Sequence, residues 1–295
     1  MGISKGGIAF FDSGIGGLTV LNECKKLLPC ENFYYYGDNR HAPYGNLPQK
    51  KIKKYVARAF KRFQRLQVKA VVLACNTATA VCVEELRQKY TFPIIGAEPA
   101  VLGAAKGGGE VFVLTTRATY ESARFQALLK KAATLYPHSK IKAFPCEGLA
   151  GAIEKNILDG RVDYTPFLPR GKPDAVVLGC THYVYIGEQI GRFYSCTVFD
   201  GNHGIAMRLR QVLEGEKTQK TPLNPFRPPN AKNSHFSPSN RPCEGGSRGE
   251  QEVRNKRKEK AKWSNILKKE GEQGRIYFLG SQKKRNKTIS KQTFV

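Results

Sequence analysis

Short apolar runs alternate with longer amphipathic segments along the N-terminal two thirds of the chain. Runs rich in β-branched, aromatic and aliphatic residues predict buried strands at 8–11, 33–36, 70–74, 110–115 and 175–179. The segments between them have helical spacing, most clearly after Pro48, where Ile52, Val56 and Phe60 share one face. The opposite face of that segment is rich in Lys and Arg, and we expect it to be exposed to solvent. Strands that alternate with helices predict an α/β fold with mainly parallel sheets.

An internal repeat relates two halves of the chain. The segment 70–77 (AVVLACNT) is echoed by 175–182 (AVVLGCTH), and 10–13 (FFDS) is echoed more weakly by 114–116 (LTT). The repeat predicts two related halves. If they pack about an approximate twofold axis, a shared cleft lies between them.

Each half places one cysteine where a buried strand ends, Cys75 and Cys180. Open α/β sheets bind ligands beyond the carboxyl ends of their strands, so two related halves would bring these thiols to opposite sides of one ligand. Inverting a carbon centre by proton removal needs a base on one face and an acid on the other. A thiol suits both roles, because its ordinary pKa of about 8.5 lets thiol and thiolate coexist. We expect a helix to begin directly after each cysteine, and a helix N-terminus favours the thiolate. We therefore predict that Cys75 and Cys180 are opposed proton carriers.

Polar residues beside the two cysteines are candidates for anchoring a small acidic amino acid. Hydroxyl and amide side chains that follow strand ends are Ser13, Asn76, Thr77 and Thr181. Asp12 either receives the substrate ammonium, assists Cys75, or caps the helix expected after the glycine-rich turn 14–17. His182 is placed to orient or protonate groups around Cys180.

The chemistry expected here needs neither a cofactor nor a metal. The turn at 14–17 matches neither GxGxxG nor the P-loop, and no frame for a pyridoxal phosphate lysine is recognisable. The eight cysteines contain no CxxC pair, which disfavours a zinc site. We expect reduced thiols, with packing or surface roles for Cys24, Cys30, Cys82, Cys146, Cys196 and Cys243.

The formal charge of +25 is concentrated toward the C-terminus. Residues 216–295 contain 20 Lys and Arg against 7 Asp and Glu, so this arm carries +13. Its prolines and lack of apolar period predict a disordered segment at 217–273, and 274–279 returns as a final strand. We expect this basic arm to bind polyanions only nonspecifically. No secretory leader or membrane-spanning run is recognisable, so a cytoplasmic location is expected.

Four motifs together resemble those of the glutamate racemases, within the cofactor-independent aspartate/glutamate racemase superfamily. They are FDSGIGG at 11–17, YGDNRHAPYG at 36–45, ACNTA at 74–78 and GCTHY at 179–183. The resemblance extends through residues 7–213 and implies two pseudo-symmetric αβα domains with mainly parallel sheets around an active-site cleft. By this resemblance we expect the first domain to comprise residues 1–97 with the returning part 205–295, and the second to comprise residues 98–204. Val184, where the family commonly has proline, and the C-terminal arm depart from the family pattern.

The resemblance also implies roles for individual residues. Cys75 would take the α-proton from D-glutamate, assisted by Asp12, and Cys180 would take it from L-glutamate, assisted by His182. Glu154 is similar in placement to an auxiliary family glutamate. The implied substrate-binding residues are Asp12, Ser13, Tyr44, Gly45, Asn76, Thr77, Thr181 and His182. In bacteria this activity supplies D-glutamate for peptidoglycan, and hence for the cell wall and cell shape; a homodimer is compatible with the resemblance.

Two alternatives stay open at this point. One is a racemase of the same superfamily that acts on aspartate or another small acid, although the His after Cys180-Thr181 favours glutamate because aspartate racemases resemble CTE there. The other, of a different class, is a basic nucleic-acid-binding protein. Neither an aromatic RNA-reading motif nor a helix-turn-helix pattern is recognisable, and we expect no specific nucleic-acid partner.

Overall fold

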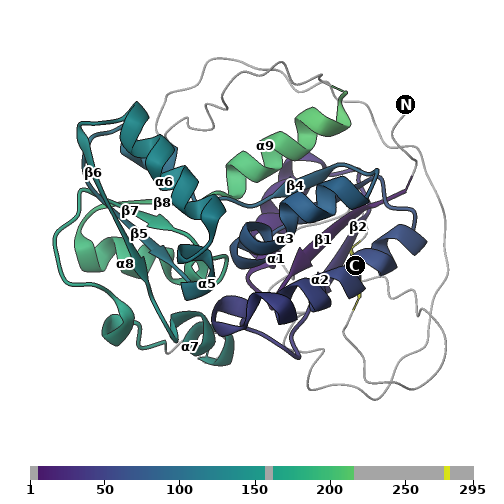
Figure 1. The fold of residues 1–295 in the computed structure, drawn as a ribbon, viewed down its shortest axis with the longest axis horizontal. Helices are drawn as coiled ribbons and strands as arrows, with labels where there is room; N and C mark the ends of the chain where they lie inside the picture. The colour runs from purple at the N-terminus through teal and green to yellow at the C-terminus, as the bar shows by residue number, and fades with distance from the viewer. Residues whose placement is uncertain (1–5, 157–161, 216–275, 280–295) are drawn as a thin grey trace.

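The computed structural model describes residues 6–156, 162–215 and 276–279. The segment expected to be disordered, 217–273, lies outside these described residues. Two sheets lie beside each other in Figure 1, and helices flank both. None of the described helices combines the length and the apolar character needed to cross a bilayer.

The first sheet is built from strands of the N-terminal region and one strand close to the C-terminus. The elements up to the crossover are β1 (Ile8–Asp12), α1 (Gly17–Leu27), β2 (Phe33–Gly37), η1 (Tyr44–Asn46), α2 (Gln49–Arg65), β3 (Ala70–Leu73), α3 (Asn76–Lys89), β4 (Ile94–Gly96) and α4 (Val101–Ala105). After the second sheet the chain continues with α9 (Asn202–Leu213), which packs beside α1, and β9 (Ile276–Phe278), which pairs with β2. The final strand expected near 274–279 is confirmed.

The second sheet is built from the intervening residues. Its elements are β5 (Gly109–Thr115), α5 (Arg117–Tyr120), α6 (Ala123–Leu135), β6 (Ser139–Pro145), α7 (Leu149–Asn156), η2 (Thr165–Phe167), β7 (Ala175–Leu178), η3 (Tyr183–Ile186), α8 (Gly187–Tyr194) and β8 (Thr197–Phe199). The domain boundaries at 97/98 and 204/205 stay a prediction.

The two sheets share one strand order, which is the structural counterpart of the sequence repeat. The first runs β4-β3-β1-β2-β9 and the second β6-β5-β7-β8, with every described pair parallel. Read from the other edge, the second sheet is β8-β7-β5-β6, so β3 corresponds to β7 and β1 to β5. The repeated sequence AVVL forms β3 and β7. The expected α/β fold with two parallel sheets is therefore confirmed.

Alternation along the strands divides the first core between the two faces of its sheet. Ile8 and Phe10 of β1 pack with α1 and α9, whereas Ala9 and Phe11 pack with α2 and α3. Because both faces are covered, the central strands are apolar throughout, as is usual for parallel sheets. The second sheet is likewise covered by α4 and α6 on one face and by α7 and α8 on the other.

Helix α2 shows how the amphipathic pattern becomes packing. Proline 48 precedes its first turn, and the fully buried residues along it are Ile52, Val56, Ala59, Phe60 and Phe63. Their spacing of three and four residues forms one face against the sheet. Truncating Phe60 to alanine would cost about 3–5 kcal/mol of stability, because a cavity would remain in this layer.

Two expectations differ from the structure. An α-helix was expected directly after each cysteine; α3 follows Cys75, but Cys180 enters a turn and the 3-10 helix η3, and the α-helix α8 begins only at Gly187. Reduced thiols were expected throughout, and Cys24, Cys75, Cys82, Cys146, Cys180 and Cys196 are free, whereas Cys30 is disulfide-bonded. Cys243 lies outside the described residues.

Candidate active site

Cys75 is the N-cap of α3, immediately beyond the carboxyl end of β3. Its sulfur accepts a hydrogen bond from the Ala78 N–H (3.5 Å), and its thiol donates to Ser13 Oγ (3.6 Å). Burial raises the pKa of the Cys75 thiol to about 12, and the negative charges of Asp12 and Cys180 act in the same direction. The Ala78 and Ser13 contacts oppose this rise but do not cancel it, so Cys75 is a thiol in this state.

Cys180 lies at the matching position after β7, with a histidine and a glutamate behind it. His182 Nδ1 is 3.8 Å from Cys180 Sγ, and His182 Nε2 is hydrogen-bonded to Glu154 Oε2 of α7. Burial disfavours a charged imidazole, but the Cys180 and Glu154 hydrogen bonds and the Asp12 charge outweigh it, and the pKa of His182 is raised well above 6.5. Cys180 therefore lies beside an imidazole that Glu154 holds in place from its other side.

Asp12 connects the two halves. Its Oδ2 accepts a hydrogen bond from the Gly14 N–H (2.8 Å), and its Oδ1 accepts one from the Thr181 hydroxyl (3.1 Å), which belongs to the other half of the chain. The carboxyl group is fully buried. Burial raises its pKa, while His182 and the Gly14 N–H oppose that rise.

Backbone atoms of the glycine-rich turn bring the halves into close contact. A Cβ at Gly16 would meet the Thr181 hydroxyl and lie 2.8 Å from the His182 backbone nitrogen. A Cβ at Gly14 would lie 2.5 Å from Glu154 Oε2, and the Ile15 N–H donates to that same oxygen (3.3 Å). Glycine is therefore required in this turn by the close approach of residues from the second half.

A cluster of three threonines forms a second contact between the halves. Thr77 Oγ1, in the first turn of α3, lies 2.9 Å from Thr116 Oγ1 and 3.3 Å from Thr119 Oγ1 of the second half. All three are buried. Neither Thr116 nor Thr119 was predicted as a site residue, although Thr116 belongs to the weaker repeat with the FFDS segment, which is a signal for its position.

The loop before α2 supplies the remaining candidates. Tyr44 is buried and donates to Asp38 Oδ2 (2.6 Å), and His41 Nδ1 lies 2.9 Å from the same carboxylate. A Cβ at Gly45 would lie 2.9 Å from Thr116 Cβ, so this loop also borders the second half. Asp38 therefore organises the loop. The only sequence signal for this role is the position of Asp38 within the YGDNRHAPYG motif.

The predicted site residues thus gather where the carboxyl ends of β1, β3 and β7 meet. Their members from the first half are Asp12, Ser13, Tyr44, Gly45, Cys75, Asn76 and Thr77, and those from the second are Glu154, Cys180, Thr181 and His182. Asn76 is 9% exposed, and its Oδ1 has no hydrogen-bond partner within the described residues, which leaves an acceptor beside Cys75. In the same part of the chain, no group of three His, Cys, Asp or Glu side chains is arranged to hold a metal ion.

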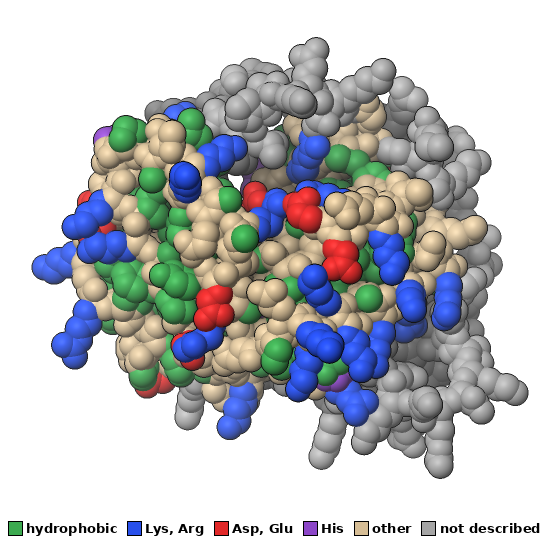
Figure 2. Space-filling model, in the orientation of Figure 1, with side chains coloured by type: hydrophobic (Ala, Val, Ile, Leu, Met, Phe, Trp, Pro, Cys, Tyr) green, Lys and Arg blue, Asp and Glu red, His purple; other side chains and the backbone are tan. Residues whose placement is uncertain are grey.

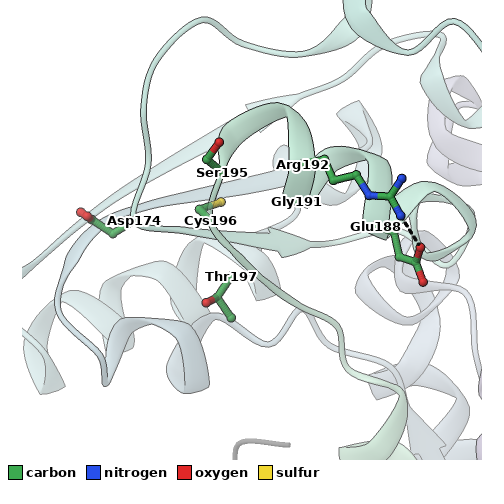
Figure 3. Close-up of a pocket in the computed structure, with 7 residues that line it drawn as sticks. All are labelled: Asp174, Glu188, Gly191, Arg192, Ser195, Cys196 and Thr197. Carbon is green, nitrogen blue, oxygen red and sulfur yellow. Dashed lines mark hydrogen bonds and ion pairs between the residues drawn. The ribbon is translucent and has the colours of Figure 1, made fainter.

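A surface hollow of the described residues lies elsewhere. It is situated on the outer side of the second sheet around α8 and β8, and Figure 3 shows the Glu188–Arg192 ion pair (3.2 Å) at its rim. Its lining residues are Asp174, Glu188, Gly191, Arg192, Ser195, Cys196 and Thr197. None of these is a candidate site residue, and burial and the negative charge of Asp174 raise the pKa of the Cys196 thiol.

Comparison with known proteins agrees with a racemase site. The family Asp/Glu/Hydantoin racemase matches residues 35–209. A glutamate racemase of Clostridium botulinum (strain Kyoto / Type A2) is 38% identical over 226 residues, which cover 72% of this chain and 86% of that protein.

Solved structures give the same picture. Glutamate racemase of Escherichia coli, in complex with L-glutamate and the activator UDP-MurNAc-ala, superposes with a TM-score of 0.64 at 31% identity, covering 72% of this chain and 84% of that one. Glutamate racemase of Francisella tularensis, in complex with D-glutamate, superposes with a TM-score of 0.60 at 28% identity, covering 73% and 84%.

The fold and the site define a racemase, an enzyme of the isomerase class. This chain belongs to the Asp/Glu/Hydantoin racemase family.

Proposed function

We propose that this protein interconverts L- and D-glutamate by two-base transfer of the α-proton between Cys75 and Cys180. The single observation that carries the proposal is the paired placement of these sulfurs after β3 and β7, each with its own hydrogen-bonding partners. The hydrogen bond from Thr181 to Asp12 (3.1 Å), beside these two strand ends, supports a shared site for the two sulfurs. The glutamate complexes of the E. coli and F. tularensis relatives support the choice of substrate.

The two thiols exchange roles between the two enantiomers. With L-glutamate, Cys180, assisted by His182, removes the α-proton, and Cys75, a buried thiol, returns a proton to the opposite face. D-glutamate is processed in reverse, with Cys75 as the base after it has given up its proton. Glu154 holds His182 in its charged form, and Asp12 balances charge between the two thiols.

Binding of glutamate is assigned to groups that contact one another in this structure. The substrate ammonium pairs with Asp12, and the carboxylates bind to Ser13, Asn76, Thr77 and Thr181, with the loop residues Tyr44 and Gly45 closing over them. In this structure Thr181 is hydrogen-bonded to Asp12, and Thr77 is hydrogen-bonded to Thr116. Bound substrate replaces these two hydrogen bonds with its own hydrogen bonds to the same side chains. Thr116 and Thr119 join the substrate-binding set on the same grounds.

The cellular role follows from the activity. We propose that the enzyme works without a cofactor in the cytoplasm, supplies D-glutamate for peptidoglycan, and thereby supports the cell wall and cell shape. The oligomeric state, for which a homodimer is proposed, is accessible by light scattering.

Substrate choice is tested by incubating the purified chain separately with L-glutamate, D-glutamate, L-aspartate and D-aspartate and following the circular dichroism of each solution. The expected result is decay of the signal to zero for both glutamate enantiomers and none for aspartate at the same enzyme concentration. Faster decay with aspartate would assign the protein to the alternative substrate. A constant signal with all four would remove the racemase proposal for this chain.

A further inference from the structure

The exposed face of α2 carries a stripe of positive charge. At about 100° per residue, Lys50, Lys54, Arg58, Lys61 and Arg65 fall within about 80° of one another around the helix axis, opposite the buried face. All five of these residues, called the α2 stripe below, are exposed. Lys and Arg side chains gather along this helix in Figure 2. The stripe begins just after the loop that contains Tyr44 and runs away from the active site.

The charge of the α2 stripe is not balanced locally. Helix α2 contains no Asp or Glu, and among the described residues none of the five stripe side chains has a carboxylate within 4.0 Å. The neighbouring Lys53, outside the stripe, is paired with Glu85 of α3 (2.9 Å). Like charges spaced by four residues, as in Lys50–Lys54 and Lys61–Arg65, destabilise a helix. A helix face that contacts only solvent would be equally soluble with a mixture of acidic and basic side chains.

The dimensions of the α2 stripe fit the phosphates of a DNA duplex. From Lys50 to Arg65 the helix rises about 22 Å, and each nucleotide of one DNA strand rises about 3.4 Å along the duplex axis, so a stripe parallel to that axis extends over about six phosphates of one strand. Arginine side chains bind phosphate in a bidentate way, and lysines act as point charges. We propose that duplex DNA docks along the α2 stripe through its phosphates, without reading sequence. This activity is separate from the proposed racemase function and does not rest on it.

Other occupants fit the α2 stripe less well. The C-terminal arm carries +13 and a second copy of the chain carries +25, so both are repelled by it. An anionic membrane surface usually also receives apolar side chains, and the large exposed hydrophobic residues of the described chain are Leu135 and Phe193, on α6 and α8. The stripe offers charge alone.

The test measures fluorescence anisotropy of a labelled random-sequence DNA duplex with the full-length chain at a series of salt concentrations. The stripe variant K54Q/R58Q/K61Q/R65Q is compared with the control K106Q/K130Q/K131Q/R170Q, which removes four exposed charges elsewhere and keeps the C-terminal arm. Wild type is expected to bind with a steep salt dependence. The stripe variant is expected to bind at least about 10-fold more weakly, with the slope of log K against log salt reduced by about 3–4, whereas the control changes by less than about twofold.

Several results would overturn the proposal. One is the absence of DNA binding by wild type. Equal losses of affinity in the two variants would assign binding to net charge, and unchanged affinity in the stripe variant would assign it to the C-terminal arm. Displacement of the DNA by phosphatidylserine vesicles at equal phosphate concentration would assign the stripe to a lipid surface. Glutamine preserves helix propensity, and racemisation of glutamate with a thermal melt verifies that the stripe variant is folded.

Discussion

The Thr181 hydroxyl donates a 3.1 Å hydrogen bond to the carboxylate of Asp12, although the two residues are 169 positions apart in the chain. Thr181 follows the end of β7 and Asp12 is the last residue of β1, so this bond joins the two sheets at their carboxyl ends. Both residues are buried. This contact therefore links the two halves at the proposed site.

Replacing Thr181 with valine tests that contact. A buried carboxylate that loses a hydrogen-bond donor costs about 1–3 kcal/mol, and we expect kcat/KM to fall about 10- to 100-fold. Because the equilibrium constant between enantiomers is one, the fall must be equal for L- and D-glutamate. Thr181→Ser keeps the hydroxyl and should retain most of the activity. Equal rates for the valine and serine variants would show that the hydroxyl is irrelevant.

Glu154→Gln changes the pH dependence. The Glu154 hydrogen bond is one of the causes that raise the pKa of His182, so the variant should shift the basic limb of the kcat/KM profile to lower pH. Glu188→Gln, which alters an exposed ion pair on α8, is the matched control and should leave the profile unchanged. If the kcat/KM profiles of the Glu154 variant and wild type were superimposable, Glu154 would have no part in the reaction.

The same variant has a defined effect on stability. A histidine whose folded pKa is raised above its ordinary value stabilises the protein fully below pH 6.5, and this contribution disappears as the pH rises through the folded pKa. Loss of stability in Glu154→Gln should therefore be largest near about pH 6 and fade at alkaline pH. Urea unfolding at a series of pH values measures this; a loss that grows with pH would contradict the assignment.

Gly16→Ala should separate folding from catalysis. Its new Cβ would lie against Thr181 and the His182 backbone, so the halves must move apart, and a displacement of this kind costs about 100-fold in rate. Gly151→Ala on α7 is the control, because its Cβ would meet nothing closer than Pro43 at 3.8 Å. The expected result is loss of activity for Gly16→Ala alone, with both variants folded by circular dichroism. Full activity in Gly16→Ala would refute the close approach.

The parts of the fold that could be predicted are those with a strong local signal. Strands β1, β2, β3, β5 and β7 were predicted because most are buried on both faces, whereas the edge strand β6 mixes Lys with apolar residues and lies partly exposed. The position of the thiols followed from the repeat. The contacts of His182 with Glu154 and of Thr77 with Thr116 depend on how distant elements pack, and no sequence spacing encodes them.

The most direct test of the two-thiol reaction follows L- and D-glutamate in heavy water with wild type, Cys75→Ser and Cys180→Ser, by optical rotation and by α-deuterium content. For wild type we expect inversion of both enantiomers, with deuterium in the product while the remaining substrate keeps its hydrogen early in the reaction. Each serine variant should racemise at least about 1000-fold more slowly, because one face has lost its acid or base. Full racemisation by both variants, or a wild-type product that retains the substrate hydrogen, would contradict the account.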